Sequence, residues 1–148
     1  MTRIHLLNLQ RARPIPTRRA AALAARMLRR FGVRTGALSL VFVGTRRMRS
    51  LNRRYHHQDR VTDVLAFDLR SAVERHRRHL AGDVIIAPEV ARRAAKRYGL
   101  TYTEELLTYV AHGMLHLLGY RDGTPRTRER MEQLQREFVH PQQQRRSN

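Results

Sequence analysis

The segment from His112 to Asp122 constrains this chain more than any other part of it. It reads His-Gly-Met-Leu-His-Leu-Leu-Gly-Tyr-Arg-Asp, so His112 and His116 stand four residues apart. On a helix, this spacing presents both imidazoles on one face, close enough to bind one metal ion. Gly119 can adopt the left-handed conformation that ends a helix, and the returning chain then brings Asp122 round as a third ligand. Three protein ligands with one open position are typical of catalytic zinc.

The residue after the first histidine limits the chemistry. Zinc proteases of the His-Glu-x-x-His type carry their general base there, whereas this chain has Gly113. The segment therefore predicts a metal hydrolase that does not perform ordinary peptide cleavage. Two plainer interpretations remain open. The histidines could be satisfied by hydrogen bonds alone, and Asp122 could only shape a turn, because Asp-Gly is a common turn dipeptide.

The composition predicts one strongly basic domain over residues 1–148, with a frayed tail at 141–148. Thirty basic residues face twelve acidic ones, a formal charge of +18. We expect a polyanion as partner, with nucleic acid ahead of an anionic membrane surface. The absence of cysteine excludes thiolate metal sites and cysteine nucleophiles. The sequence contains no apolar run of membrane-spanning length and no secretory signal, which favours the cytoplasm.

Hydrophobic periodicity, together with glycine and proline positions, predicts an α+β fold. A small, mixed, four-stranded sheet should pack with about five helices, one of them a zincin-like metal helix. The polar residues 69–80 should form an exposed connection, and Tyr55, four residues after Leu51, should belong to the core. The expected strands are 3–9, 37–43, 63–68 and 82–87, and the expected helices are 17–31, 45–55, 89–98, 101–118 and 127–138.

Four blocks of the sequence resemble a known family in order and spacing. The family's signature helix reads His-Gly-x-Leu-His-Leu-x-Gly-Tyr-Asp-His, and this chain departs from it only at Arg121 and Asp122. The other blocks are residues 51–56 (Leu-Asn-Arg-Arg-Tyr-His), 62–67 (Thr-Asp-Val-Leu-Ala-Phe) and 82–86 (Gly-Asp-Val-Ile-Ile). Over about residues 37–123 the chain thus resembles the YbeY family, bacterial metal-dependent endoribonucleases implicated in ribosomal RNA maturation.

The resemblance implies a single-strand endoribonuclease that acts in ribosomal RNA processing, ribosome maturation and quality control. Its partners would be a ribosomal RNA precursor and the small ribosomal subunit, in the cytoplasm and without a membrane. One divalent ion, zinc in the first instance, would be held by His112, His116 and Asp122. Asp122 replaces the family's third histidine, and zinc accepts an aspartate oxygen. A harder oxygen ligand could shift the preference towards manganese.

One further departure concerns the chemistry. His56 stands where the family has an arginine, and as a catalytic residue it could donate to phosphate when protonated or act as a base when neutral. Histidine cannot form the bidentate hydrogen bonds that arginine makes to a phosphate, and Arg54 or Arg121 could supply these instead. Arg53, Arg54 and Arg121 are accordingly expected to bind RNA. They belong to a wider basic region, which includes Arg46, Arg47, Arg49, His57 and Arg60.

Two rival functions remain. A non-catalytic ribosome- or RNA-binding assembly factor could retain this fold after losing turnover through the changes at His56 and Asp122. A zinc peptidase is also compatible with the ligand spacing, which metzincin proteases share, but Gly113 and the basic charge count against it. The sequence does not indicate an oligomeric state.

Overall fold

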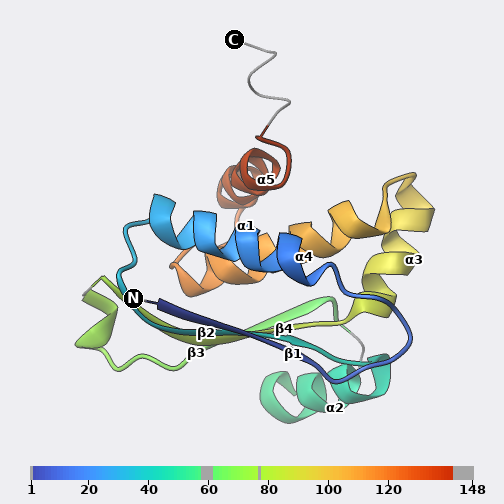
Figure 1. Ribbon diagram of the computed structural model, residues 1–148, viewed down its shortest axis with the longest axis horizontal. Coiled ribbons are helices and arrows are strands. Elements are labelled where there is room, and N and C mark those ends of the chain that lie inside the picture. Colours follow the sequence, from blue (N-terminus) through green and yellow to red (C-terminus); the bar gives the residue numbers. More distant parts are fainter. Residues whose placement is uncertain (1, 58–61, 77, 142–148) are drawn as a thin grey trace.

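The computed structural model describes residues 2–57, 62–76 and 78–141 and confirms the expected order of strands and helices (Figure 1). The expected positions of Arg60 and of the tail beyond residue 141 lie outside the described residues. A short 3₁₀ helix spans Glu74–His76. The strands are Thr2–Asn8 (β1), Thr35–Phe42 (β2), Val64–Asp68 (β3) and His79–Ile86 (β4). The α-helices are Thr17–Arg30 (α1), Thr45–His56 (α2), Pro88–Tyr98 (α3), Tyr102–Leu117 (α4) and Pro125–Val139 (α5).

The four strands form one mixed sheet in the order β1-β2-β4-β3. β1, β2 and β4 are parallel, and β3 runs antiparallel to β4 as the other arm of a hairpin. Helices α1 and α4 cover one face of the sheet, while α2 covers part of the opposite face (Figure 1). The result confirms the predicted α+β class, with β1 and β3 as the two edges of the sheet.

Helix α4 lies at the centre of the main core. Nine of its residues are buried, because it packs on the sheet on one side and on α1 and α5 on the other. At Gly113 the helix lies so near the sheet that an added β-carbon would be 2.4 Å from Cγ1 of Val84. A β-carbon at Gly82 of β4 would similarly meet the Leu117 side chain at 2.8 Å. The two glycines let the helix that carries the histidines lie directly on β3 and β4.

Several boundaries differ from the sequence-based expectation. β4 begins at His79, three residues early, because the parallel register with β2 extends to the pair Thr35–His79. α5 begins at Pro125, since Thr124 and Thr127 form a reciprocal capping box there. At α4, Thr101 is the N-cap, and its Oγ1 accepts from the Glu104 amide at 3.2 Å.

The expectation that Tyr55 belongs to the core was wrong, since its side chain is 52% exposed. It lies in the last turn of α2, and its ring contacts Phe67 of β3 edge-on at 5.3 Å between ring centroids. Helix α2 buries only Met48 and Asn52, so helical spacing from Leu51 was too weak a sign of burial.

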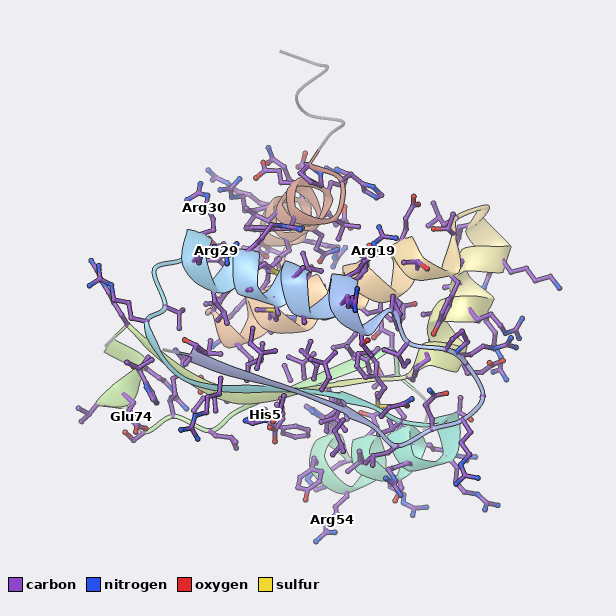
Figure 2. The ribbon with its side chains drawn as sticks, viewed as in Figure 1. His5, Arg19, Arg29, Arg30, Arg54 and Glu74 are labelled. Atoms are coloured by element: carbon purple, nitrogen blue, oxygen red, sulfur yellow. The ribbon has the colours of Figure 1, made fainter. Side chains whose placement is uncertain are left out.

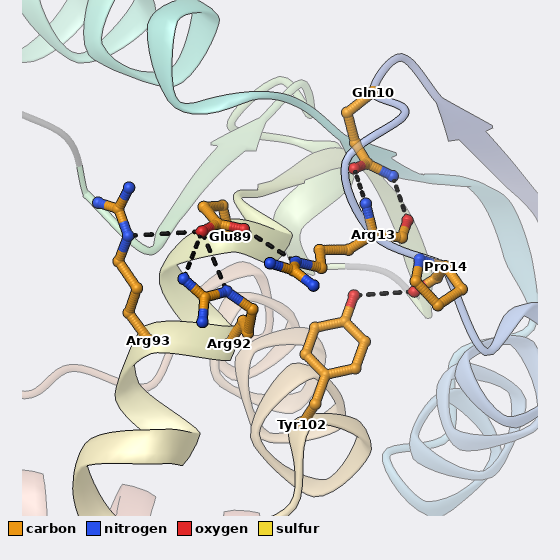
Figure 3. Close-up of polar contacts among 7 residues, drawn as sticks. All are labelled: Gln10, Arg13, Pro14, Glu89, Arg92, Arg93 and Tyr102. Carbon is orange, nitrogen blue, oxygen red and sulfur yellow. Dashed lines mark hydrogen bonds and ion pairs between the residues drawn. The ribbon is translucent and has the colours of Figure 1, made fainter.

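Glu89 in α3 anchors the segment that joins β1 to α1 (Figure 3). Its carboxylate accepts from Arg13 Nε at 3.0 Å and from Arg92 Nη2 at 2.7 Å. These hydrogen bonds lower the pKa of Glu89 to about 2, Arg92 contributing most. Beside this cluster, the Tyr102 hydroxyl donates to the Pro14 carbonyl at 2.8 Å. The segment between β1 and α1 is thereby tied both to α3 and to the first turn of α4.

Among the described residues, no helix combines the length and apolar character needed to cross a membrane.

Candidate functional site

The second half of α4 and the loop after it build the candidate metal site. The helix ends at Leu117, and Gly119 adopts a left-handed φ of 98°. The chain then folds back, and the Tyr120 amide donates to the Leu115 carbonyl at 3.0 Å. This confirms the predicted return bend. It places Asp122 opposite His112 and His116, so that all three offer a ligand atom to one point.

The three side chains have the spacing of a metal site. Nε2 of His112 lies 3.0 Å from Nε2 of His116, and each of these nitrogens lies 3.7 Å from Oδ2 of Asp122. The point equidistant from the three atoms is about 2.0 Å from each, which matches zinc bonds to histidine nitrogen and aspartate oxygen of about 2.0–2.2 Å. The donor set therefore fits one divalent ion.

Both histidines are held through their other ring nitrogen. Nδ1 of His116 lies 3.1 Å from the Tyr120 carbonyl, and Nδ1 of His112 lies 2.7 Å from Oε1 of Gln135 in α5. An oxygen of either kind can only accept, so each Nδ1 carries the proton and each Nε2 presents a lone pair. Burial lowers the pKa of His116, with the neighbouring His112 adding to the effect, which favours the neutral form that binds metal.

Gly113 explains why the protease signature is absent. The direction in which its side chain would grow is filled by Val84 and by Val64, whose Cγ1 would lie 2.9 Å from an added β-carbon. A glutamate at this position would be forced against the sheet and away from the histidine pair. The fold thus provides no space for the carboxylate base of a His-Glu-x-x-His enzyme at position 113.

An open cleft of about 660 Å³ reaches the candidate metal site at His116, the one of the three candidate ligands that lines it. His116 and Arg121 line it at the end of α4, and His56 lines it from the end of α2. Val64 and Ala66 of edge strand β3 form part of its wall. The structure therefore brings His56, Arg121 and a histidine of the candidate site to one cavity.

The other predicted RNA-binding residues lie outside the cleft lining. Arg53 and Arg54 are exposed in the last turns of α2, and Arg54 projects away from the sheet (Figure 2). The Arg54 guanidinium carbon lies 5.5 Å from the centroid of the Tyr55 ring. Of the exposed residues in the last turn of α2, His56 is the one that lines the cleft.

Sequence reasoning missed Arg70, in the segment that we expected to be an exposed connection. Arg70 lines the cleft and forms a bidentate ion pair with Asp68, in which Nε and Nη2 each lie 2.9 Å from a carboxylate oxygen. Its guanidinium also donates to the Leu117 carbonyl at the end of α4. The side-chain hydrogen bond from Arg70 also lowers the pKa of Asp68. Arg70 therefore fixes the end of the histidine helix to the end of β3. Sequence reasoning also missed Gln135, the hydrogen-bond partner of His112.

The fold and the site together define a class: α+β proteins in which a two-histidine helix and its return loop offer three convergent ligands beside a basic cleft. The family model described as "Endoribonuclease YbeY" matches residues 5–143. The chain belongs to the YbeY family, which confirms the resemblance seen in the sequence.

Individual relatives agree with this assignment. The Endoribonuclease YbeY of Geobacter metallireducens is 35% identical over 140 residues, which cover 92% of this chain and 93% of that protein. Matches to proteins of the same name from Myxococcus xanthus (42% identical) and Anaeromyxobacter sp. (39%) cover 69% and 86% of this chain. They span only 35% and 63% of those longer relatives. The solution structure of TM1509 from Thermotoga maritima has a TM-score of 0.62 at 25% identity, covering 94% of this chain and 87% of that one.

Proposed function

We propose that this protein is a metal-dependent endoribonuclease that cleaves single-stranded RNA during ribosomal RNA processing, ribosome maturation and quality control in a bacterial cytoplasm. The observation that carries the proposal is the convergence of His112, His116 and Asp122 beside a cleft that also contains His56 and Arg121. Family membership and the formal charge of +18 support RNA as the substrate. The ribosomal RNA precursor and the small subunit are the proposed partners.

Under this proposal, one divalent ion, with zinc as the first candidate, is held by Nε2 of His112, Nε2 of His116 and Oδ2 of Asp122. When bound, the ion polarises a phosphoryl oxygen and makes water a better nucleophile at neutral pH. The carboxylate of Asp122 adds a negative charge that a third imidazole would not add. This charge makes the bound water less acidic. The oxygen ligand also favours harder ions, such as manganese, more than a third histidine would.

The remaining roles fall to residues around the cleft. His56 is exposed at the edge of the cleft, where its imidazole can take a proton from a reacting hydroxyl or, when protonated, donate to a phosphate. Arg121 makes no ion pair with any residue that the structure describes, so its guanidinium is available for the RNA backbone. Arg53 and Arg54 extend this contact along α2 and add salt-dependent affinity.

The test is cleavage of a single-stranded RNA oligonucleotide by the purified protein. We expect cleavage to be lost on adding a chelator, to return on adding zinc or manganese, and to be absent in His116→Ala. His5→Ala is the matched control, because His5 is exposed on β1, at the edge of the sheet opposite β3 (Figure 2). Cleavage that survives both the chelator and His116→Ala would contradict the metal mechanism.

The replacements at Asp122 and His56 favour one alternative, a ribosome- or RNA-binding assembly factor without turnover. The double variant Asp122→His and His56→Arg restores the family's residues at these two positions and separates the two functions. If ribonuclease activity appears only in this variant, the natural chain is a binding protein.

The zinc peptidase is disfavoured by the packing at Gly113, and chelator-sensitive cleavage of casein would revive it.

A further inference from the structure

Helix α5 does more than cover the core. Its buried residues Met131 and Leu134 face the hydrophobic core, and Phe138 contacts the Phe31 ring of α1 at 5.9 Å between centroids. Arg26 of α1 donates to the Phe138 carbonyl at 2.7 Å. These contacts fix the position of α5 without any help from Gln135, so the orientation of the Gln135 side chain serves another purpose.

The Gln135 side chain points towards the histidine pair. Its Oε1 lies 2.7 Å from Nδ1 of His112, and both side chains are partly buried. A neutral imidazole carries one ring proton, and an amide oxygen can only accept. The contact therefore keeps the proton on Nδ1 and leaves the lone pair of Nε2 directed at His116 and Asp122. In the other tautomer, the proton would sit on Nε2 and block metal binding.

The second histidine shows by comparison why Gln135 matters. His116 is held in the same tautomer by the Tyr120 carbonyl, a main-chain group that the return bend places there whatever the side chain is. His112 lies one turn earlier in α4, where the helix carbonyls are engaged within the helix, so its partner must come from another element. Gln135, 23 residues later in the sequence, provides that partner.

We propose that Gln135 is a positioning residue of the metal site: it orients His112, fixes its metal-binding tautomer and thereby couples the docking of α5 to metal affinity. This inference rests on the proposed function, because it assumes that the three convergent side chains bind a metal ion. Partners of this kind typically change metal affinity by about 10–100-fold when they are removed.

The experiment compares two near-isosteric variants in the full-length protein. Gln135→Met keeps the length of the side chain but cannot accept a hydrogen bond, whereas Gln135→Glu still can. Gln133→Met is the matched control, since Gln133 is an exposed glutamine of the same helix. Zinc affinity is measured by competition with a chromogenic chelator at fixed pH, and the coordination geometry is followed by the visible spectrum of the cobalt-loaded protein.

We expect Gln135→Met to weaken zinc binding by about 10–100-fold and to alter the cobalt spectrum. Gln135→Glu should bind at least as tightly as the natural protein, because a carboxylate accepts the same proton and raises the basicity of the imidazole. Gln133→Met should change neither measurement. The melting temperature of the metal-free variants separates a loss of positioning from a loss of folding.

Affinity within about twofold of the natural protein in Gln135→Met would overturn the proposal, as would equal weakening in Gln135→Met and Gln135→Glu. Failure of the natural protein to bind zinc or cobalt at all would instead overturn the proposed metal-dependent function. The two failures are therefore distinguishable without measuring ribonuclease activity.

Discussion

The packing at Gly113 makes a quantitative prediction about stability. An alanine β-carbon there would lie 2.4 Å from Val84 Cγ1 and 2.9 Å from Val64 Cγ1, whereas ordinary van der Waals contacts are 3.4–4 Å. Val84 is fully buried and branched, so it cannot move aside. Gly113→Ala must therefore push α4 away from the sheet. Overpacking of this kind costs about 1–3 kcal/mol, against which alanine regains up to about 1 kcal/mol of helix propensity.

Because both contacts are shorter than 3.0 Å, we place the overpacking cost at the upper end of this range. We therefore expect Gly113→Ala to lower the free energy of unfolding by about 2 kcal/mol. Val84→Ala removes both methyl groups and should by itself cost about 2 kcal/mol through the lost burial and the cavity. In the Val84→Ala background, the new methyl of Gly113→Ala fills that cavity. The contact with Val64 Cγ1 at 2.9 Å remains, so the second substitution should then cost less than about 1 kcal/mol, giving a coupling of at least about 1 kcal/mol between the two sites.

The assay is urea denaturation of the four proteins of this double-mutant cycle, with a chelator present so that metal binding does not contribute. Gly123→Ala is the control, because nothing lies within 4 Å of an added β-carbon there, and it should stay within about 0.5 kcal/mol of the natural protein. Additive costs for Gly113→Ala and Val84→Ala would refute the reasoning from close packing.

Three further predictions follow from separate parts of the molecule. Asp122→Ala should reduce bound metal while leaving the melting temperature of the metal-free protein unchanged; unchanged metal content would remove Asp122 from the ligand set. Tyr55→Ala should weaken binding of single-stranded RNA by about 1–3 kcal/mol through lost stacking, whereas Tyr98→Ala, another exposed tyrosine with an arginine over its ring, should not; equal effects would exclude a stacking role. Glu89→Gln should be less stable than the natural protein at neutral pH. Since folding lowers the pKa of Glu89 from 4.5 to about 2, the difference should disappear as the pH falls through that interval, and a difference that persists below pH 2 would contradict the ion-pair origin.

The order of the elements was predictable because local patterns specify it. Alternating apolar residues in β2 and β4, helical spacing in α1 and glycines at the helix ends are all properties of short segments. The convergence of Asp122 with the histidines was also predictable, since the three residues lie within eleven positions and one glycine determines the bend between them. That these side chains bind a metal ion stays a prediction.

Features that depend on the docking of distant elements could not be predicted in this way. Gln135 reaches His112 only because α5 packs beside α4, and no spacing rule connects them. Arg70 lay in a polar segment whose role depends on where the β3–β4 hairpin meets the end of α4. The exposure of Tyr55 follows from how far α2 extends over the sheet, which is a property of the assembled fold.

The sheet separates two groups of side chains that a nuclease would need. Helices α2 and α4, which carry the arginines and the histidines, lie on opposite faces of the sheet (Figure 1). His56 of α2 and His116 of α4 both line the cleft beside β3. Exposed arginines on α2 can thus be exchanged without disturbing the packing under α4. Under the proposed function, such substitutions should change which RNAs the protein binds while the side chains of the candidate metal site keep their positions.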